Sequence, residues 1–238
     1  MKLKLILFDF SGTLAYLRQP DPKEFFLTLD NFGIKIETPE EIKSFASLFA
    51  GLLGFTKNWL DFSEKLFRDY NPPAARGAQK KVWEGGGRVG VPPKRAPFVE
   101  KLGRETIKNL ADFFSKTIIF ELYDDVKEIF ALPFQKAILS ANARFIVESL
   151  GLQRFAEIFT PGETKTLKPD PKAFLVVLNK LKVKPEEVLM VGDEVERDLI
   201  PAQKLGMKTV LVDRENKVKD YSGIKINSLG EIKNILGL

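Results

Sequence analysis

The chain of 238 residues contains neither cysteine nor histidine. Their absence excludes cysteine nucleophiles, Ser-His-Asp triads, disulfide scaffolds and zinc sites built on these two residue types. Any acid, base or nucleophile must therefore come from Asp, Glu, Lys, Tyr, Ser or Thr. Hard cations with oxygen ligands, magnesium among them, remain compatible with the composition.

Long apolar runs are also missing. The opening segment 1–8 resembles the start of a signal peptide, but its apolar run is short and Asp9 interrupts it. No stretch is long enough to cross a bilayer. We therefore expect a cytoplasmic protein with no export signal and no membrane partner.

Short apolar runs that end in polar residues predict the fold class. Four such runs lead into Asp9, Ser140, Asp193 and Asp213, as buried parallel strands do when polar residues follow their carboxyl ends. Helical patterns lie between these runs, for example at residues 171–181. Strands alternating with helices predict an α/β fold with a doubly wound, mostly parallel, Rossmann-like sheet. We expect the four polar strand ends to face one crevice.

Residues 17–120 interrupt this alternation and have the pattern of helices. The sequence Thr38-Pro39-Glu40-Glu41 forms a capping box, and Phe45 and Phe49 follow at helical spacing. We therefore predict an inserted α-helical domain after the first strand. The expected domains are a Rossmann-like core of residues 1–16 and 121–238 and a helical module of residues 17–120.

Within this insert, residues 72–98 contain five Gly and five Pro but no Ile or Leu, which predicts a loop. Six basic residues against Glu84 give this stretch a charge of +5, equal to the net charge of the whole chain. Clusters of Lys and Arg attract phosphate backbones. Trp83 is the one aromatic residue among these charges, and no helix or strand presents them. We therefore expect a solvated loop and no nucleic-acid partner.

The polar strand ends and one helix-leading loop carry what phosphoryl transfer needs, namely an in-line nucleophile, a cation and fixed hydrogen-bond donors. Asp9 can act as the nucleophile and form an aspartyl-phosphate. Asp9 and Asp193 can share a magnesium ion, which prefers one or two carboxylates plus waters and phosphate oxygens. Lys168 can compensate their negative charge, because Asp170 can cap the next helix and leave the ammonium facing the crevice. Ser140 can donate its hydroxyl to a phosphate oxygen.

Four short motifs, taken in order, resemble those of the haloacid dehalogenase-like superfamily. They are Asp9-Phe10-Ser11-Gly12-Thr13-Leu14, Ser140 after an apolar strand, Lys168-Pro169-Asp170-Pro171, and Gly192-Asp193 with Asp198. The resemblance covers residues 1–16 and 121–238, and the helical insert occupies the position of that family's cap. The motifs are specific for the superfamily and hardly specific for the substrate.

The resemblance implies a role for each residue of the motifs. Asp9 is then the nucleophile, and magnesium is held by Asp9, the main-chain carbonyl of Ser11, and Asp193. Asp198 is implied to support the metal site from outside direct coordination. The candidate metal residues are therefore Asp9, Ser11, Asp193 and Asp198, and the candidate catalytic residues are Asp9, Ser11 and Lys168.

The remaining candidates bind the substrate. These candidate substrate-binding residues are Thr13, Ser140, Asn142 and Lys168. The chain departs from the family pattern at two points. Phosphatases of the family usually carry a second Asp where this chain has Ser11, and a residue such as Asn often follows the motif serine directly, whereas Ala141 intervenes here.

The expected function is that of a magnesium-dependent phosphohydrolase acting on a small phosphorylated metabolite. Two alternatives stay open. The same nucleophile would dehalogenate a small haloacid without a metal, although Asp193 beside Gly192 favours a metal site. A catalytically weak phosphate-binding protein is the second alternative, and Ser11 is its main support.

Overall fold

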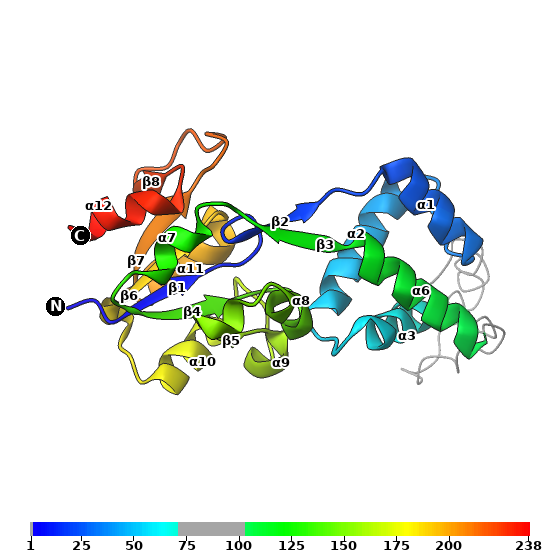
Figure 1. The fold of residues 1–238 in the computed structure, drawn as a ribbon, viewed down its shortest axis with the longest axis horizontal. Coiled ribbons are helices and arrows are strands. Elements are labelled where there is room, and N and C mark those ends of the chain that lie inside the picture. Colours follow the sequence, from blue (N-terminus) through cyan, green and yellow to red (C-terminus); the bar gives the residue numbers. More distant parts are fainter. Residues whose placement is uncertain (1, 71–102) are drawn as a thin grey trace, which may run out of the picture. The chain divides into compact units, whose positions relative to one another are not determined.

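The computed structural model describes residues 2–70 and 103–238, so the loop predicted at 72–98 lies outside the described residues. The chain divides into two units. The first consists of Met1–Arg18 and Phe120–Leu238, and the second is Gln19–Ile119. Figure 1 shows a sheet flanked by helices in the first unit and helices in the second.

The first unit is built on a parallel sheet with the strand order β5-β4-β1-β6-β7-β8 (Figure 1). Its strands are β1 (Leu5–Phe8), β4 (Gln135–Leu139), β5 (Glu157–Phe159), β6 (Val188–Gly192), β7 (Lys208–Val212) and β8 (Ile224–Ile226). Strand β1 lies between β4 and β6, which places Phe8 level with Ile138 and Val191. All four residues of β1 are buried. Burial on both faces is the reason why this strand has an uninterrupted apolar sequence.

Helices cover both faces of this sheet, and most of them are short. They are α7 (Val126–Phe130), α8 (Arg144–Ser149), η1 (Leu152–Arg154), α9 (Pro161–Thr164), α10 (Pro171–Leu181), η2 (Pro185–Glu187), η3 (Val195–Leu199), α11 (Ile200–Lys204), η4 (Leu229–Glu231) and α12 (Ile232–Leu236). On one face, Phe174 of α10 and Ala202 of α11 pack in a cluster with Leu7 of β1. Side chains alternate along a strand, so Phe8 points to the other face, where Ile129 of α7 lies beside it.

Two further strands pair with each other outside the main sheet. They are β2 (Ala15–Arg18) and β3 (Ile119–Leu122). Tyr16 donates its hydroxyl to Glu121 Oε2 at 2.5 Å, which joins the two strands. The ring of Tyr16 lies 5.0 Å from that of Tyr123, measured between ring centroids. The strands stand where the chain leaves and re-enters the first unit.

The second unit, within its described residues, contains the helices α1 (Pro22–Asn31), α2 (Pro39–Leu53), α3 (Trp59–Asp69) and α6 (Arg104–Thr117). Aromatic rings fill its core. The ring centroid of Phe62 lies 4.6 Å from that of Phe49 and 5.2 Å from that of Phe114, and Trp59 stacks on Phe114 at 6.0 Å. Edge-to-face and stacked pairs of this kind add stability beyond the area that they bury.

The sequence-based prediction of the fold class is confirmed. The sheet is parallel and flanked by helices, and the capping box at Thr38 and Glu41 starts α2. Strands β2, β3, β5 and β8 were not predicted, because each has only three or four residues and none of them is buried along its whole length as β1 is. Among the described residues, no helix has the length and apolar character that crossing a bilayer requires.

We expect Phe114→Ala to lower the free energy of unfolding of the second unit by about 3–5 kcal/mol, because the ring is fully buried and its loss leaves a cavity. Trp59 stacks on this ring, so its fluorescence during urea unfolding provides the measurement. Leu27→Ala, at a side chain that is 65% exposed, serves as the control and should change the value by less than about 0.5 kcal/mol. Equal effects of the two substitutions would contradict the aromatic core.

Candidate active site

Asp9 follows the central strand and is held there by the sheet. Its main-chain N–H donates to the carbonyl of Val191 in β6 at 2.8 Å, which continues the β1–β6 ladder by one residue. The side chain is only 9% exposed, and its Oδ1 accepts a hydrogen bond from Lys168 Nζ. The carboxylate therefore lies at the carboxyl end of the sheet, where parallel α/β folds bind their ligands.

Lys168 reaches Asp9 from the loop that leads into α10. Asp170 caps that helix by accepting from the main-chain N–H of Lys172 at 2.9 Å, as predicted, and Thr166 donates to the other oxygen of Asp170 at 2.9 Å. The ammonium of Lys168 is buried and donates to both Asp9 and Asp198. Burial alone would lower the pKa of Lys168, but the two carboxylates outweigh it and hold this pKa above its ordinary value.

Asp198 comes from η3, a turn of π-helix that follows β6. Its side chain is almost fully buried. One oxygen accepts from Lys168 and the other from the main-chain N–H of Glu194, at 3.2 Å. Burial, and next the charge of Asp9, raise the pKa of Asp198 to about 6. Gly192 makes this approach possible, because a Cβ there would lie 2.6 Å from Asp198 Oδ2.

Asp193 stands at the end of β6 and is half-buried. Its Oδ1 accepts from the hydroxyl of Thr13 at 3.2 Å. Burial is the main cause that raises its pKa to about 7, and the charges of Asp9 and Asp198 add to the effect. Gly12 is required beside it for two reasons. The backbone there has a φ of +89°, and a Cβ would lie 2.1 Å from Asp193 Oδ2.

Asp9, Asp193 and Asp198 form one carboxylate cluster. Each contributes an oxygen that lies within 4.8 Å of those of the other two. The ammonium of Lys168 contacts two of these three carboxylates, so the acidic groups outnumber the basic one in a largely buried setting. Such a donor set fits a hard divalent cation such as magnesium. Asp9 and Asp193 are the residues that would hold the cation, because both oxygens of Asp198 already accept hydrogen bonds.

The other predicted residues lie in the loops around this cluster. Ser140 is buried at the end of β4, and its Oγ accepts from the main-chain N–H of Asn142 at 2.9 Å, which closes a tight turn around Ala141. Neither Ser140 nor Asn142 hydrogen-bonds to the cluster among the described residues. Thr13 does so through Asp193. Ser11 has an exposed side chain, so a larger residue has room at that position.

The fourth polar strand end differs from the expectation. The carboxylate of Asp213 does not join the cluster, because it accepts from the main-chain N–H groups of Lys217 and Val218, at 2.8 and 2.9 Å, and so closes its own loop. The next residue, Arg214, reaches the first motif instead and donates to the carbonyl of Thr13 at 2.7 Å. The sequence signal that could have pointed to this contact is the position of Arg214 directly after a predicted strand end.

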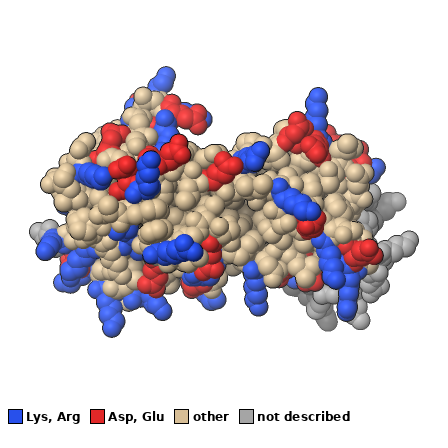
Figure 2. All heavy atoms as spheres, in the orientation of Figure 1, with Lys and Arg blue, Asp and Glu red and all other residues tan. Residues whose placement is uncertain are grey.

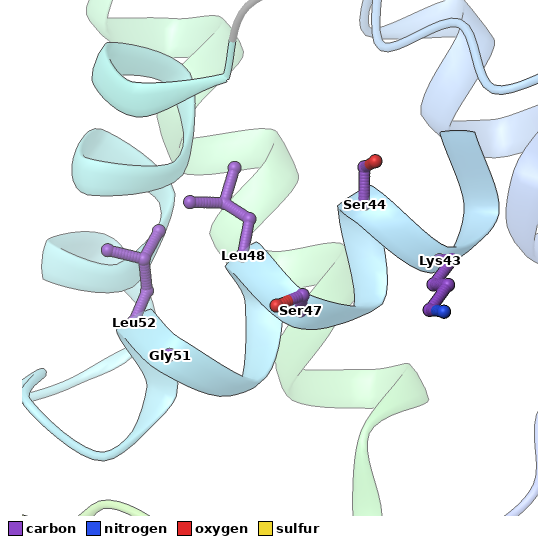
Figure 3. Close-up of a pocket in the computed structure, with 6 residues that line it drawn as sticks. All are labelled: Lys43, Ser44, Ser47, Leu48, Gly51 and Leu52. Atoms are coloured by element: carbon purple, nitrogen blue, oxygen red, sulfur yellow. The ribbon is translucent and has the colours of Figure 1, made fainter. Parts of the chain in front are cut away.

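The second unit has a surface hollow on α2 (Figure 3). Its lining residues are Lys43, Ser44, Ser47, Leu48, Gly51 and Leu52. The lining holds no carboxylate to assist either serine. We therefore place the chemistry at the carboxylate cluster and not at this hollow.

The charges on the face seen in Figure 2 are mixed, with Lys and Arg side chains interspersed among Asp and Glu. Interspersed charges do not create the field of a single sign that draws in nucleic acids. The basic stretch at residues 72–98, which raised the question of nucleic-acid binding, lies outside the described residues. The described part of this face therefore gives no support to a nucleic-acid partner.

Comparison with known proteins identifies the family. The sequence profile of haloacid dehalogenase-like hydrolases matches residues 3–206, which is most of the chain. The chain belongs to this family and is a hydrolase of the haloacid dehalogenase-like type. The resemblance of the four motifs is thereby confirmed.

Individual relatives within the family include both phosphatases and dehalogenases. Phosphoserine phosphatase from Thermus thermophilus is 26% identical over 214 residues, which cover 78% of this chain and 86% of that protein. Several further curated relatives match over less than half of their own length. Two solved structures have a TM-score of 0.58 and cover 99% of this chain and 98% of their own. They are a HAD phosphatase from Thermococcus onnurineus, 22% identical, and a 2-haloacid dehalogenase from Pseudomonas syringae, 17% identical. The fold is therefore common to phosphatases and dehalogenases.

The raised pKa of Asp193 predicts how the stability of the metal-free protein depends on pH. Between its ordinary pKa of 3.8 and about 7, the native state keeps a proton on Asp193 that the unfolded chain has released. The stability from this proton is complete below pH 3.8 and is lost as the pH rises through about 7. We expect the unfolding free energy in EDTA, wild type minus Asp193→Asn, to fall over this window in urea titrations.

Asp170→Asn is the matched control for this measurement. Hydrogen bonds from Lys172 and Thr166 lower the pKa of Asp170, so its contribution to stability is present above pH 3.8 and is lost at lower pH. Asparagine also caps helices, which leaves the start of α10 intact. The two differences in unfolding free energy, wild type minus variant, should therefore change with pH in opposite directions. The difference for Asp193→Asn falls as the pH rises above 3.8, and the difference for Asp170→Asn falls as the pH drops below 3.8. A flat profile for Asp193→Asn would show that Asp193 is ionised in the native protein throughout.

Proposed function

We propose that the chain is a magnesium-dependent phosphohydrolase that acts on a small phosphorylated metabolite through an aspartyl-phosphate on Asp9. The observation that carries this proposal is the cluster of Asp9, Asp193 and Asp198, two of which, Asp9 and Asp198, accept hydrogen bonds from the buried ammonium of Lys168. A phosphatase among the curated relatives, aligned over most of both chains, supports it. The unit Gln19–Ile119 corresponds in this proposal to the family's helical cap.

The proposed reaction has two steps, for which the site supplies a nucleophile and phosphate-binding groups. Asp9 attacks the phosphorus atom and forms a carboxyl oxygen–phosphorus bond while the bond to the leaving oxygen breaks. Water then attacks the same phosphorus atom, the carboxyl oxygen–phosphorus bond breaks, and inorganic phosphate and the free carboxylate of Asp9 result. Of the two protons of this water, one ends on the phosphate and the other on the leaving oxygen of the first step. Lys168 neutralises negative charge beside Asp9 and donates to the phosphate, together with the hydroxyl of Ser140. Magnesium, held by Asp9, Asp193 and the main-chain carbonyl of Ser11, would supply further positive charge against the phosphate oxygens.

The metal-free dehalogenase is the competing function, and the shared fold does not exclude it. The carboxylates argue against it. Without a cation, burial and the neighbouring carboxylates disfavour the ionised form of Asp193, whereas a cation compensates this cost. The other alternative, a catalytically weak phosphate-binding protein, is supported by Ser11, because the serine hydroxyl is a very poor proton carrier at neutral pH.

We expect the hydrolysis of an aryl phosphate to require magnesium and to be abolished in Asp9→Asn, because the amide neither attacks phosphorus nor balances a metal charge. The measurement is the release of the phenol with and without EDTA. Asp112→Asn makes the same chemical change at an exposed position of α6 and should leave the rate unchanged. Equal rates in EDTA, or a fully active Asp9→Asn variant, would overturn the phosphatase assignment.

The serine at position 11, in place of a second Asp, predicts that aryl phosphates are hydrolysed faster than alkyl phosphates. Alkyl leaving groups need a proton and aryl ones do not, and general acid–base help is worth about 10²–10⁴-fold. We therefore expect a low ratio of alkyl to aryl phosphate turnover in the wild type and a rise of at least about tenfold in Ser11→Asp, with little change in magnesium dependence. The exposed side chain of Ser11 leaves room for the larger residue.

Ser11→Asn separates proton transfer from size in this experiment. The amide has the dimensions of the carboxyl group but donates no acidic proton, so it should leave the ratio as in the wild type. If Ser11→Asn raised the ratio as much as Ser11→Asp, the effect would come from shape. A wild-type ratio that is already high, and that Ser11→Asp lowers, would mean that another group supplies the proton.

A further inference from the structure

Arg214 follows β7 and has its guanidinium fixed by three neighbours. Its two terminal nitrogens donate to the two carboxyl oxygens of Asp125 at 2.8 and 3.0 Å. The guanidinium carbon lies 3.7 Å from the centre of the Tyr123 ring, within the range of a cation–π contact. Its third neighbour is Thr13, whose carbonyl accepts from Nη2 at 2.7 Å. The side chain is only 16% exposed, so these contacts are largely shielded from water.

Asp125 is itself anchored, so it can act as a fixed support for Arg214. Its carboxylate also accepts from the hydroxyl of Ser228 and from the main-chain N–H of Leu229, both at 2.9 Å. Burial alone would raise the pKa of Asp125, but the hydrogen bonds from Arg214, Leu229 and Ser228 outweigh it and lower that pKa. Three segments of the first unit therefore meet at this one carboxylate, and the guanidinium has little freedom to move.

Thr13 connects Arg214 to the carboxylate cluster. Thr13 is fully buried; its carbonyl accepts from Arg214 and its hydroxyl donates to Asp193 Oδ1 at 3.2 Å. The preceding residue, Gly12, lies so close to Asp193 that even a Cβ would not fit. A shift of the turn at Gly12 and Thr13 toward Asp193 would therefore displace its carboxylate. Main-chain hydrogen bonds from Gly12, Leu14 and Ala15 form this turn, and Arg214 adds the side-chain donor to the carbonyl of Thr13.

We propose that Arg214 is a positioning residue of the metal site, which acts through Thr13 to hold the carboxylate of Asp193 toward Asp9. The inference rests on the proposed function, because it assigns magnesium to these carboxylates. Arg214 itself donates no hydrogen bond to Asp193 or Asp9; its acceptors are Asp125 and Thr13. Removing its guanidinium leaves the buried carbonyl of Thr13 without its donor, and the turn relaxes to find another one. Groups that orient metal ligands in this way commonly affect metal affinity by about 10–100-fold.

The test is the magnesium dissociation constant, measured by calorimetry without substrate. We expect Arg214→Met to bind magnesium at least about tenfold more weakly than the wild type, and Arg214→Lys to recover part of the loss because one donor can still reach Thr13. Thr13→Val keeps the carbonyl and the shape of the side chain but removes the hydroxyl, so it should weaken binding as well. The double variant Arg214→Met/Thr13→Val should bind magnesium no more weakly than the weaker-binding of the two single variants, because both substitutions interrupt the same connection from Arg214 through Thr13 to Asp193.

Lys225→Met is the matched control. Lys225 makes three hydrogen bonds to the loop that contains Arg214, with Asp213, Asn216 and Val218 as acceptors, but none to Thr13. Its loss should leave magnesium affinity unchanged. An unchanged affinity in Arg214→Met, an equal loss in Lys225→Met, or additive losses in the double variant would each overturn the inference. If Arg214→Met does not fold, Arg214→Lys and Thr13→Val still decide the outcome. A wild-type chain that binds no magnesium would instead overturn the proposed function.

Discussion

The contact of Lys168 with Asp9 and Asp198 is the interaction on which the rest of the site depends. All three side chains are less than 10% exposed, and a buried charge is tolerated only where partners and hydrogen bonds compensate its lost hydration. The local structure supplies that compensation from several elements. Asp170 starts α10 so that the lysine points inward, and the main-chain N–H of Glu194 holds the far oxygen of Asp198. Without the ammonium of Lys168, the buried carboxylates of Asp9 and Asp198 would lose the cation that compensates their charge.

Beside this group stands a third carboxylate, Asp193, to which Lys168 donates no hydrogen bond. Asp193 is brought close to two other acids, and its raised pKa records the cost. Two glycines make the crowding sterically feasible, since neither Gly12 nor Gly192 leaves space for a methyl group. Stability has been given up here for a preorganised cluster of carboxylates, as proteins commonly do at the sites where they bind charged ligands.

Much of this could be read from the sequence, because the signals were local. The apolar runs before Asp9, Ser140 and Asp193 mark buried strands, and the capping residue Asp170 fixes where a helix begins. What the sequence did not reveal depends on distant neighbours. Asp213 ends an apolar run like the others, yet donors four and five residues later take up its carboxylate. The contact of Arg214 with Thr13 spans 201 positions and leaves no periodic trace.

The strand order has a consequence for the chain during its synthesis. The central strand β1 is made first, but both of its neighbours, β4 and β6, come after the helical unit, from residue 135 onward. At roughly 5–20 residues per second, some 130 residues correspond to about 6–26 seconds in which an apolar segment has no sheet to join. The described helices of the second unit are all synthesised before β4. In the nascent chain, β1 is therefore an apolar segment without a partner strand, and such segments are prone to aggregation.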